Sequence, residues 1–232
     1  MFVGDDGTVV PVVLQRRGDG QAEAKGWIGR GGRWQARLYH RYRMTAGDAD
    51  SPERAVAALA RAPGTPVRGR LDRAGARFDL ELRLPGALLR IEAPSLQLLG
   101  ATDDPEGESI YRAGRAELTA GARRLPGWLV AEETPARRPR RALVDYGDFS
   151  FTVAAEPERV AVAKRSRTRP GFDQRLGLPS APARDPIDDA AVLARDTTRG
   201  TGPDGRPVRY EVLLLGGAVH GVAFTIRPDN QE

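Results

Sequence analysis

The two histidines are the side chains of this chain whose type and position best fit chemistry. His40 and His220 each alternate with apolar residues, and imidazole is the side chain that gains or loses a proton nearest neutral pH. An imidazole inside an apolar interior could act as a general acid or base, or orient a ligand carbonyl. The alternative is a core histidine hydrogen-bonded to a tyrosine, because buried polar groups nearly always have a partner. We take His40 as the candidate catalytic residue.

The segment 34–44 predicts the strand that positions His40. Residues two apart lie on the same face of a strand, so strict alternation would place six side chains together: Trp34, Ala36, Leu38, His40, Tyr42 and Met44. That face combines apolar groups with a histidine and a tyrosine, as in the lining of a ligand site. We therefore predict that Trp34, His40 and Tyr42 contact a ligand.

Two further candidate ligand-binding residues come from other segments. Each tryptophan lies near a glycine and could stack on an apolar ligand at a barrel mouth, or else fill the core: Trp27, Trp34 and Trp128. His220 is in step with Val222 and Phe224, so it could enter the same cavity as His40 or lie half-exposed near a strand end. We include Trp128 and His220 among the ligand-binding candidates.

Glycine and proline, with 27 and 18 copies, separate short alternating runs throughout the chain. Runs of this kind between turn residues predict antiparallel strands, about ten to twelve in all. Residues 78–84 show the pattern clearly, because apolar and charged side chains alternate. We expect an all-β, mainly antiparallel fold that forms a single domain over residues 1–232, either a barrel or a β-sandwich.

Two segments depart from the strand pattern. Residues 50–53 supply a cap, an early proline and an acidic residue, which predicts one short α-helix near residues 51–62. Between residues 164 and 204 the alternation fades into a sequence rich in arginine, proline, aspartate and glycine. We expect an irregular arm or lid there.

The composition excludes several classes of site. The chain contains no cysteine and two histidines, which leaves little material for a transition-metal site. It has no nucleophile elbow, P-loop or dinucleotide fingerprint, so we expect no metal and no cofactor. No apolar run reaches the roughly 18 residues of a transmembrane helix, and the lack of cysteine fits a reducing compartment. We expect a cytoplasmic protein without a membrane span.

The charge balance bears on the choice of partner. A net charge of +5 and a pI near 10.0 would suit an anionic partner such as nucleic acid. However, 31 acidic residues are interspersed among 36 basic ones, so the surface charge is mixed. The densest basic clusters, residues 137–141 and 164–169, have few aromatic neighbours of the kind that stack on single-stranded bases. Nucleic acid is therefore the least favoured partner.

The segments 111–121 and 125–133 share a pattern with a known group of barrels. An aromatic-x-x-Gly strand start leads to a turn, and a Gly-Trp pair and acidic residues follow. Together with residues 78–84, this part of the chain, residues 76–133, resembles lipocalin-like β-barrels of the carotenoid-hydratase and related secreted-hydrolase type. The resemblance implies an antiparallel barrel with an apolar cavity and no particular reaction.

These observations lead to two functional hypotheses of different classes. The first is binding of a small apolar or amphipathic molecule in a β-barrel cavity, where His40 could also support hydration, isomerisation or cyclisation. The alternative is a non-enzymatic structural or assembly protein. In that case residues 164–204 would contact partner subunits, either further copies of the chain or another protein.

Overall fold

The computed structural model describes residues 1–16, 21–43, 67–71, 77–84, 87–104, 107–133, 149–166, 173–179, 190–201 and 207–229. All regular elements in these ranges are β-strands. Every strand pairing is antiparallel, from β1 with β11 to β7 with β8. The predicted all-β class is confirmed. The helix expected near residues 51–62 lies outside these ranges, and none of them contains a helix that could cross a membrane.

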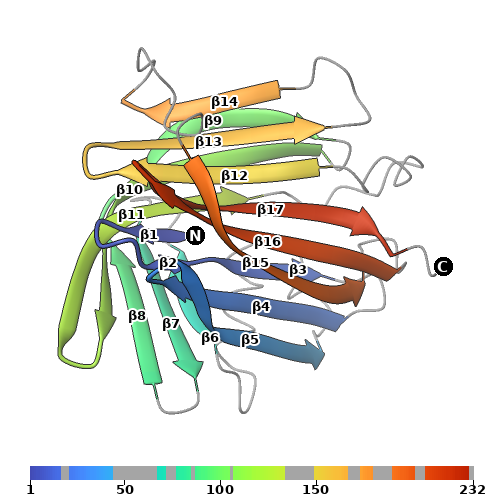
Figure 1. Cartoon of the computed structure of the whole chain (residues 1–232), viewed down its shortest axis with the longest axis horizontal. Coiled ribbons are helices and arrows are strands. Elements are labelled where there is room, and N and C mark those ends of the chain that lie inside the picture. The colour runs from blue at the N-terminus through green and yellow to red at the C-terminus, as the bar shows by residue number, and fades with distance from the viewer. Residues whose placement is uncertain are drawn as a thin grey trace.

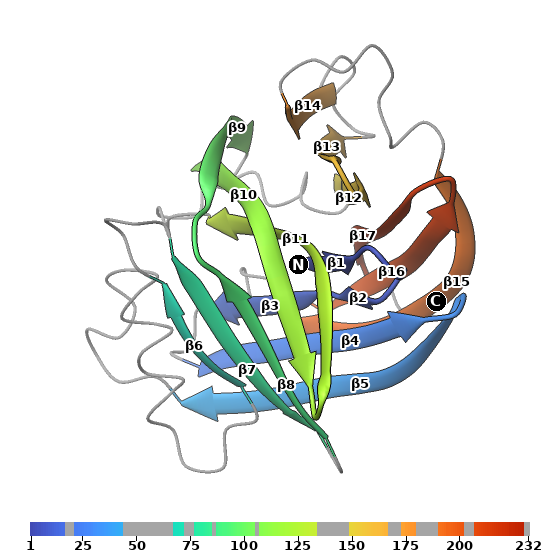
Figure 2. The same ribbon diagram turned by 90° about the vertical axis from the view of Figure 1, so that its left-hand side faces the viewer.

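Eleven strands form a sheet that curls into a half-barrel (Figure 2). These strands are β1 (Phe2–Gly4), β2 (Val9–Val10), β3 (Val12–Arg16), β4 (Gln21–Arg30), β5 (Arg33–Arg43), β6 (Val67–Leu71), β7 (Phe78–Leu84), β8 (Ala87–Ala93), β9 (Gln97–Asp104), β10 (Gly107–Ala120) and β11 (Arg123–Glu133). Their order is β3-β4-β2-β1-β11-β10-β8-β7-β6, with β5 paired to β4 and β9 paired to β10.

Local sequence features explain two irregularities of this sheet. Pro11 has no amide hydrogen to give to a ladder, and it separates β2 from β3, although both pair with β4. The long strand β10 pairs with β9 along its first half and with β8 along its second half. A bulge between Tyr111 and Arg112 interrupts the β9 pairing. Bulges increase the local twist of a sheet, which fits the curl seen in Figure 2.

The second sheet has six strands and covers one face of the first (Figure 1). Its order is β14-β13-β12-β17-β16-β15. The strands are β12 (Phe149–Glu156), β13 (Arg159–Ser166), β14 (Asp173–Leu178), β15 (Ala190–Thr201), β16 (Pro207–Gly217) and β17 (His220–Pro228). At its two ends, β14 lies beside β9 and β15 lies beside β5. The edges of the two sheets therefore meet on both sides of the molecule.

The expectation of an irregular segment over residues 164–204 needs correction. Within it, β13 continues to Ser166, and both β14 and β15 are strands of the second sheet, the latter with a bulge between Val192 and Ala194. The alternation was hard to detect because β15 is an edge strand whose side chains are mostly exposed. An edge strand does not need one apolar face, so its sequence can stay polar.

Two apolar clusters use opposite faces of the first sheet. Neighbouring residues of a strand point to opposite faces, and here Val3 packs between the two sheets while Phe2 packs inside the half-barrel. Likewise, Val9 packs between the two sheets and Val10 packs inside the half-barrel. The cluster between the sheets unites β1, β2, β4, β10 and β11 with β12, β13, β16 and β17. The two sheets therefore share a core that includes Trp27 and Phe224.

The amino group of Met1 is buried between these elements and donates a hydrogen bond of 2.7 Å to the Val130 carbonyl oxygen. Burial lowers the pKa of this amine from 8.0 to about 5, although the Glu132 carboxylate raises it in part. Between these two values the unfolded chain holds a proton that the folded chain lacks. Stability should therefore rise with pH from about 5 to 8, by at most about 1.4 kcal/mol per unit.

This pH dependence can be measured by urea unfolding of a protein produced with Met1 as its first residue. We expect a higher free energy of unfolding at pH 8 than at pH 5.5. The matched control is the same protein acetylated at Met1, which has no ionisable amine. Its free energy of unfolding should lack the increase with pH that the amine causes. Equal slopes in the two proteins would contradict a buried, neutral amine.

Candidate functional site

A bulge in the β4–β5 hairpin decides where Trp34 lies. Trp27 pairs with Arg37 and Ile28 pairs with Ala36, but Gly29 then pairs with Trp34 rather than with residue 35. Directly paired residues share a face, so Trp34 lies on the face of Trp27 and Arg37. The prediction that Trp34 shares a face with Ala36 is wrong, because the bulge inserts one extra residue between them.

Gly29 makes room for this arrangement. A Cβ atom at position 29 would lie 3.0 Å from the Trp34 ring and 2.8 Å from the Leu214 side chain. A larger residue would therefore push the indole away from its place. Glycine inside a strand often marks a bulge or a close contact, and this was the one signal in the sequence for the position of Trp34.

The other residues predicted on β5 are placed by backbone pairing alone. His40 pairs with Ala24 and Tyr42 pairs with Ala22, while the side chains of His40 and Tyr42 lie outside what the structure describes. A catalytic role for His40 and a ligand contact for Tyr42 stay predictions. Ala24 itself is buried in the cluster inside the half-barrel.

Trp128 and His220 lie in other environments. Trp128 is 8% exposed, packs in the core between the sheets, and donates from Nε1 to the Glu156 carbonyl oxygen at 2.8 Å. The His220 ring lies over Gly7, where a Cβ would approach its Cε1 atom to 3.1 Å. Both side chains therefore help the β1–β2 turn and the core to pack against the second sheet. Neither lines the cleft that contains Trp34.

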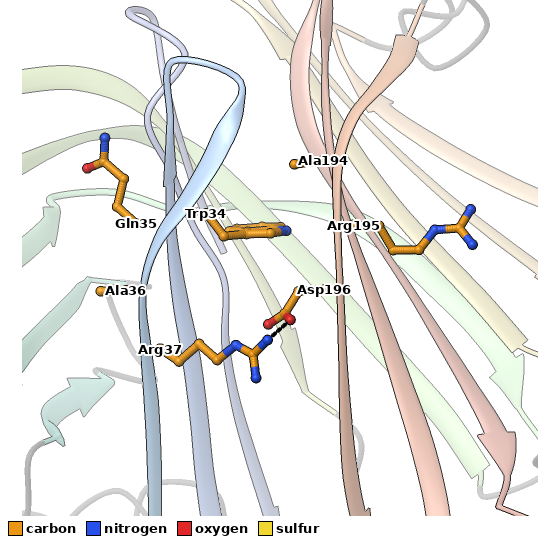
Figure 3. Close-up of a pocket in the computed structure, with 7 residues that line it drawn as sticks. All are labelled: Trp34, Gln35, Ala36, Arg37, Ala194, Arg195 and Asp196. Atoms are coloured by element: carbon orange, nitrogen blue, oxygen red, sulfur yellow. Dashed lines mark hydrogen bonds and ion pairs between the residues drawn. The ribbon is translucent and has the colours of Figure 1, made fainter.

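That cleft lies between β5 and β15 and has a volume of about 430 Å³. Seven residues line it: Trp34, Gln35, Ala36, Arg37, Ala194, Arg195 and Asp196. Figure 3 shows that Trp34 and Arg37 extend from β5 toward β15, where Asp196 meets Arg37, whereas the side chains of Gln35 and Arg195 point away. The site is thus formed by the edges of the two sheets.

Asp196 is the most constrained polar group of the cleft. Its side chain is 6% exposed and forms an ion pair with Arg37, whose side chain is 58% exposed. The carboxylate also accepts hydrogen bonds of 2.7 Å from Trp27 Nε1 and of 2.9 Å from the Thr197 backbone N–H. A buried carboxylate needs such donors to offset its loss of water. Asp196 therefore fixes β15 to β4 and holds the Arg37 guanidinium at the cleft.

Trp34 contributes a donor that is not used within the protein. Its Nε1 atom is buried and has no hydrogen-bond partner among the described residues. The indole nitrogen points across the cleft toward β15 (Figure 3). Leaving such a donor unpaired costs about 1–3 kcal/mol, so an acceptor that entered the cleft beside it would be stabilised.

A second basic side chain lies near the cleft, between β4, β15 and β16. Lys25, on β4, is 2% exposed, and its Nζ atom lies 3.7 Å from the centroid of the Tyr210 ring on β16. This is the geometry of a cation–π contact. Gly200 of β15 passes so close to Lys25 and Tyr210 that a Cβ there would clash with both. Lys25 is therefore enclosed between β4, β15 and β16, near the residues that line the cleft.

The sequence pattern indicates Trp34 but not the polar residues of the cleft. Arg37 belongs to the face of β5 that strict alternation assigned to solvent, and Asp196 falls in the segment expected to be irregular. In the part of the chain that the structure describes, histidine, aspartate and glutamate form no group of three that could hold a metal ion. The chain matches no family model, no curated protein and no solved structure.

Proposed function

We propose that this protein binds a small amphipathic molecule in the cleft between β5 and β15. The observation that carries this proposal is the buried, unpartnered Nε1–H of Trp34 at a cleft of about 430 Å³, a volume within the usual range of ligand sites. The indole ring and Ala194 offer an apolar wall. The indole N–H and the Arg37 guanidinium offer donors to the polar end of the ligand.

The arrangement of the strands is compatible with ligand entry. β5 pairs with β4 and β15 pairs with β16, and β5 and β15 form no ladder with each other in the described residues. The cleft can therefore widen without the loss of backbone hydrogen bonds between strands.

Nuclear magnetic resonance tests this proposal directly, because the three tryptophans give three indole N–H signals. The Trp34 signal is identified as the one missing from Trp34→Phe. We expect it to move when a six-carbon amphiphile, either sodium hexanoate or the neutral hexanamide, is titrated into the protein, because the ligand supplies an acceptor. The Trp128 signal is the internal control, since its N–H already has a partner. If neither compound moves the Trp34 signal, this site does not bind such ligands.

The assembly hypothesis for residues 164–204 stays a prediction. Val192 and Leu193, on the edge strand β15, are 55% and 49% exposed. Exposed apolar side chains on an edge strand are where a partner subunit would be sought.

A further inference from the structure

We propose that the polar end of the ligand is an oxyanion, a carboxylate in the simplest case, and that Arg37 is the residue that recognises it. This inference rests on the proposed function of the β5–β15 cleft and adds the chemical class of its ligand. Three observations support it: the free donor capacity of Arg37, the second donor on Trp34, and the engagement of Asp196, the one carboxylate among the residues that line the cleft.

Arg37 is held in place and still has donors to offer. Among the described residues, its guanidinium contacts Asp196 through Nη2 alone. A guanidinium carries five N–H donors in a fixed plane, so most of them remain available beside the cleft that Arg37 lines. Because Asp196 is itself held by Trp27 and Thr197, the carboxylate fixes the direction of the guanidinium. A planar, oriented guanidinium suits a carboxylate, which can accept two parallel hydrogen bonds.

Trp34 supplies the second donor on the same face. Its Nε1–H is unpartnered and shielded from solvent, so an acceptor reaches it only by entering between the indole and β15. A neutral carbonyl could accept this bond as well as a carboxylate could. The Trp34 indole therefore indicates where the acceptor atom of the ligand lies, and Arg37 favours an acceptor that carries a negative charge.

The charged groups of the cleft disfavour a cation. Asp196 is the one carboxylate among the residues that line it, and its oxygens already accept from Trp27, Thr197 and Arg37. Arg195 points away from the cleft and pairs with Glu211 at 2.9 Å. A cationic ligand would therefore meet the Arg37 guanidinium and find no unengaged carboxylate among the lining residues.

The test compares three ligands with the same six-carbon chain and different head groups. Dissociation constants for hexanoate, hexanamide and hexylammonium are measured from the shift of the Trp34 indole signal. A charge-assisted hydrogen bond is stronger than a neutral one, so hexanoate should bind at least about tenfold more tightly than hexanamide. Hexylammonium should bind most weakly. Equal affinity for hexanoate and hexanamide would overturn the oxyanion assignment and leave the proposed ligand-binding function intact.

Two arginine variants decide whether Arg37 causes the preference. Arg37→Gln should remove the difference between hexanoate and hexanamide. Arg199→Gln is the matched control, because Arg199 is an exposed, ion-paired arginine on the same strand as Asp196 but not in the cleft, and it should keep the difference. If both variants weaken hexanoate equally, the preference arises from overall charge and the assignment to Arg37 is wrong. If no ligand moves the Trp34 signal, the inference fails together with the proposed function.

Discussion

Replacing Asp196 with alanine is expected to lower the free energy of unfolding by about 2–4 kcal/mol. The carboxylate is 6% exposed and satisfies the indole N–H of Trp27 and the backbone N–H of Thr197. Alanine offers neither donor an acceptor, and the Trp27 ring is 3% exposed, so water cannot replace the lost bond easily. The variant also frees the edge strand β15 from β4, which should loosen the seam between the two sheets.

Urea unfolding monitored by circular dichroism measures this loss. Arg37→Gln is the control, because it removes the ion pair and leaves the other two partners of Asp196 in place. Exposed ion pairs contribute about 0–1 kcal/mol, and Arg37 is 58% exposed, so the control should change stability little. An Asp196→Ala protein as stable as Arg37→Gln would mean that Asp196 does not anchor β15.

Replacing Phe224 with alanine should cost about 3–5 kcal/mol, the usual range for a buried phenylalanine. Phe224 lies on β17, is 6% exposed, and packs edge-to-face on Trp27 of β4 with ring centroids 5.5 Å apart. It belongs to the cluster that lies between the two sheets. Truncation leaves a cavity at their interface, and the surrounding strands relax only in part.

The same unfolding experiment tests whether the two sheets form one cooperative unit. Leu98→Ala on β9 is the control, because Leu98 is 64% exposed and its truncation should change stability by less than about 0.5 kcal/mol. Since both sheets contribute to one core, Phe224→Ala should still unfold in a single transition at a lower urea concentration. Two separate transitions, or an effect no larger than that of Leu98→Ala, would contradict a shared core.

Strand positions could be read from the sequence where one face is buried. The alternation over residues 78–84 corresponds to β7, with Leu80 and Leu82 buried inside the half-barrel. Residues 34–43 form the body of β5, as the alternation predicts. The alternation did not reveal the bulge between Trp34 and Ala36. A bulge changes the face of every residue beyond it, and its signal, Gly29, lies on the neighbouring strand.

The polar part of the site depends on contacts that sequence spacing does not report. Asp196 meets Trp27 and Arg37 across 169 and 159 residues. β15 has no clean alternation because it is an edge strand, so its only buried carboxylate was indistinguishable from a turn residue. The glycine beside Trp128 suggested a barrel mouth and the step of His220 with Val222 suggested a cavity, but Trp128 packs in the core and His220 covers Gly7. The packing of strands that are distant in sequence therefore decides where these side chains lie, and local sequence does not report it.

A crystal structure of the protein grown with sodium hexanoate tests the proposed site most directly. We expect a ligand between β5 and β15, with its carboxylate bonded to the Arg37 guanidinium and to Trp34 Nε1, and its carbon chain against the indole ring. Asp196 should keep its bonds to Trp27 and Thr197 in that complex. A ligand bound inside the half-barrel, or a Trp34 N–H that remains unpartnered in crystals saturated with hexanoate, would contradict the proposed site.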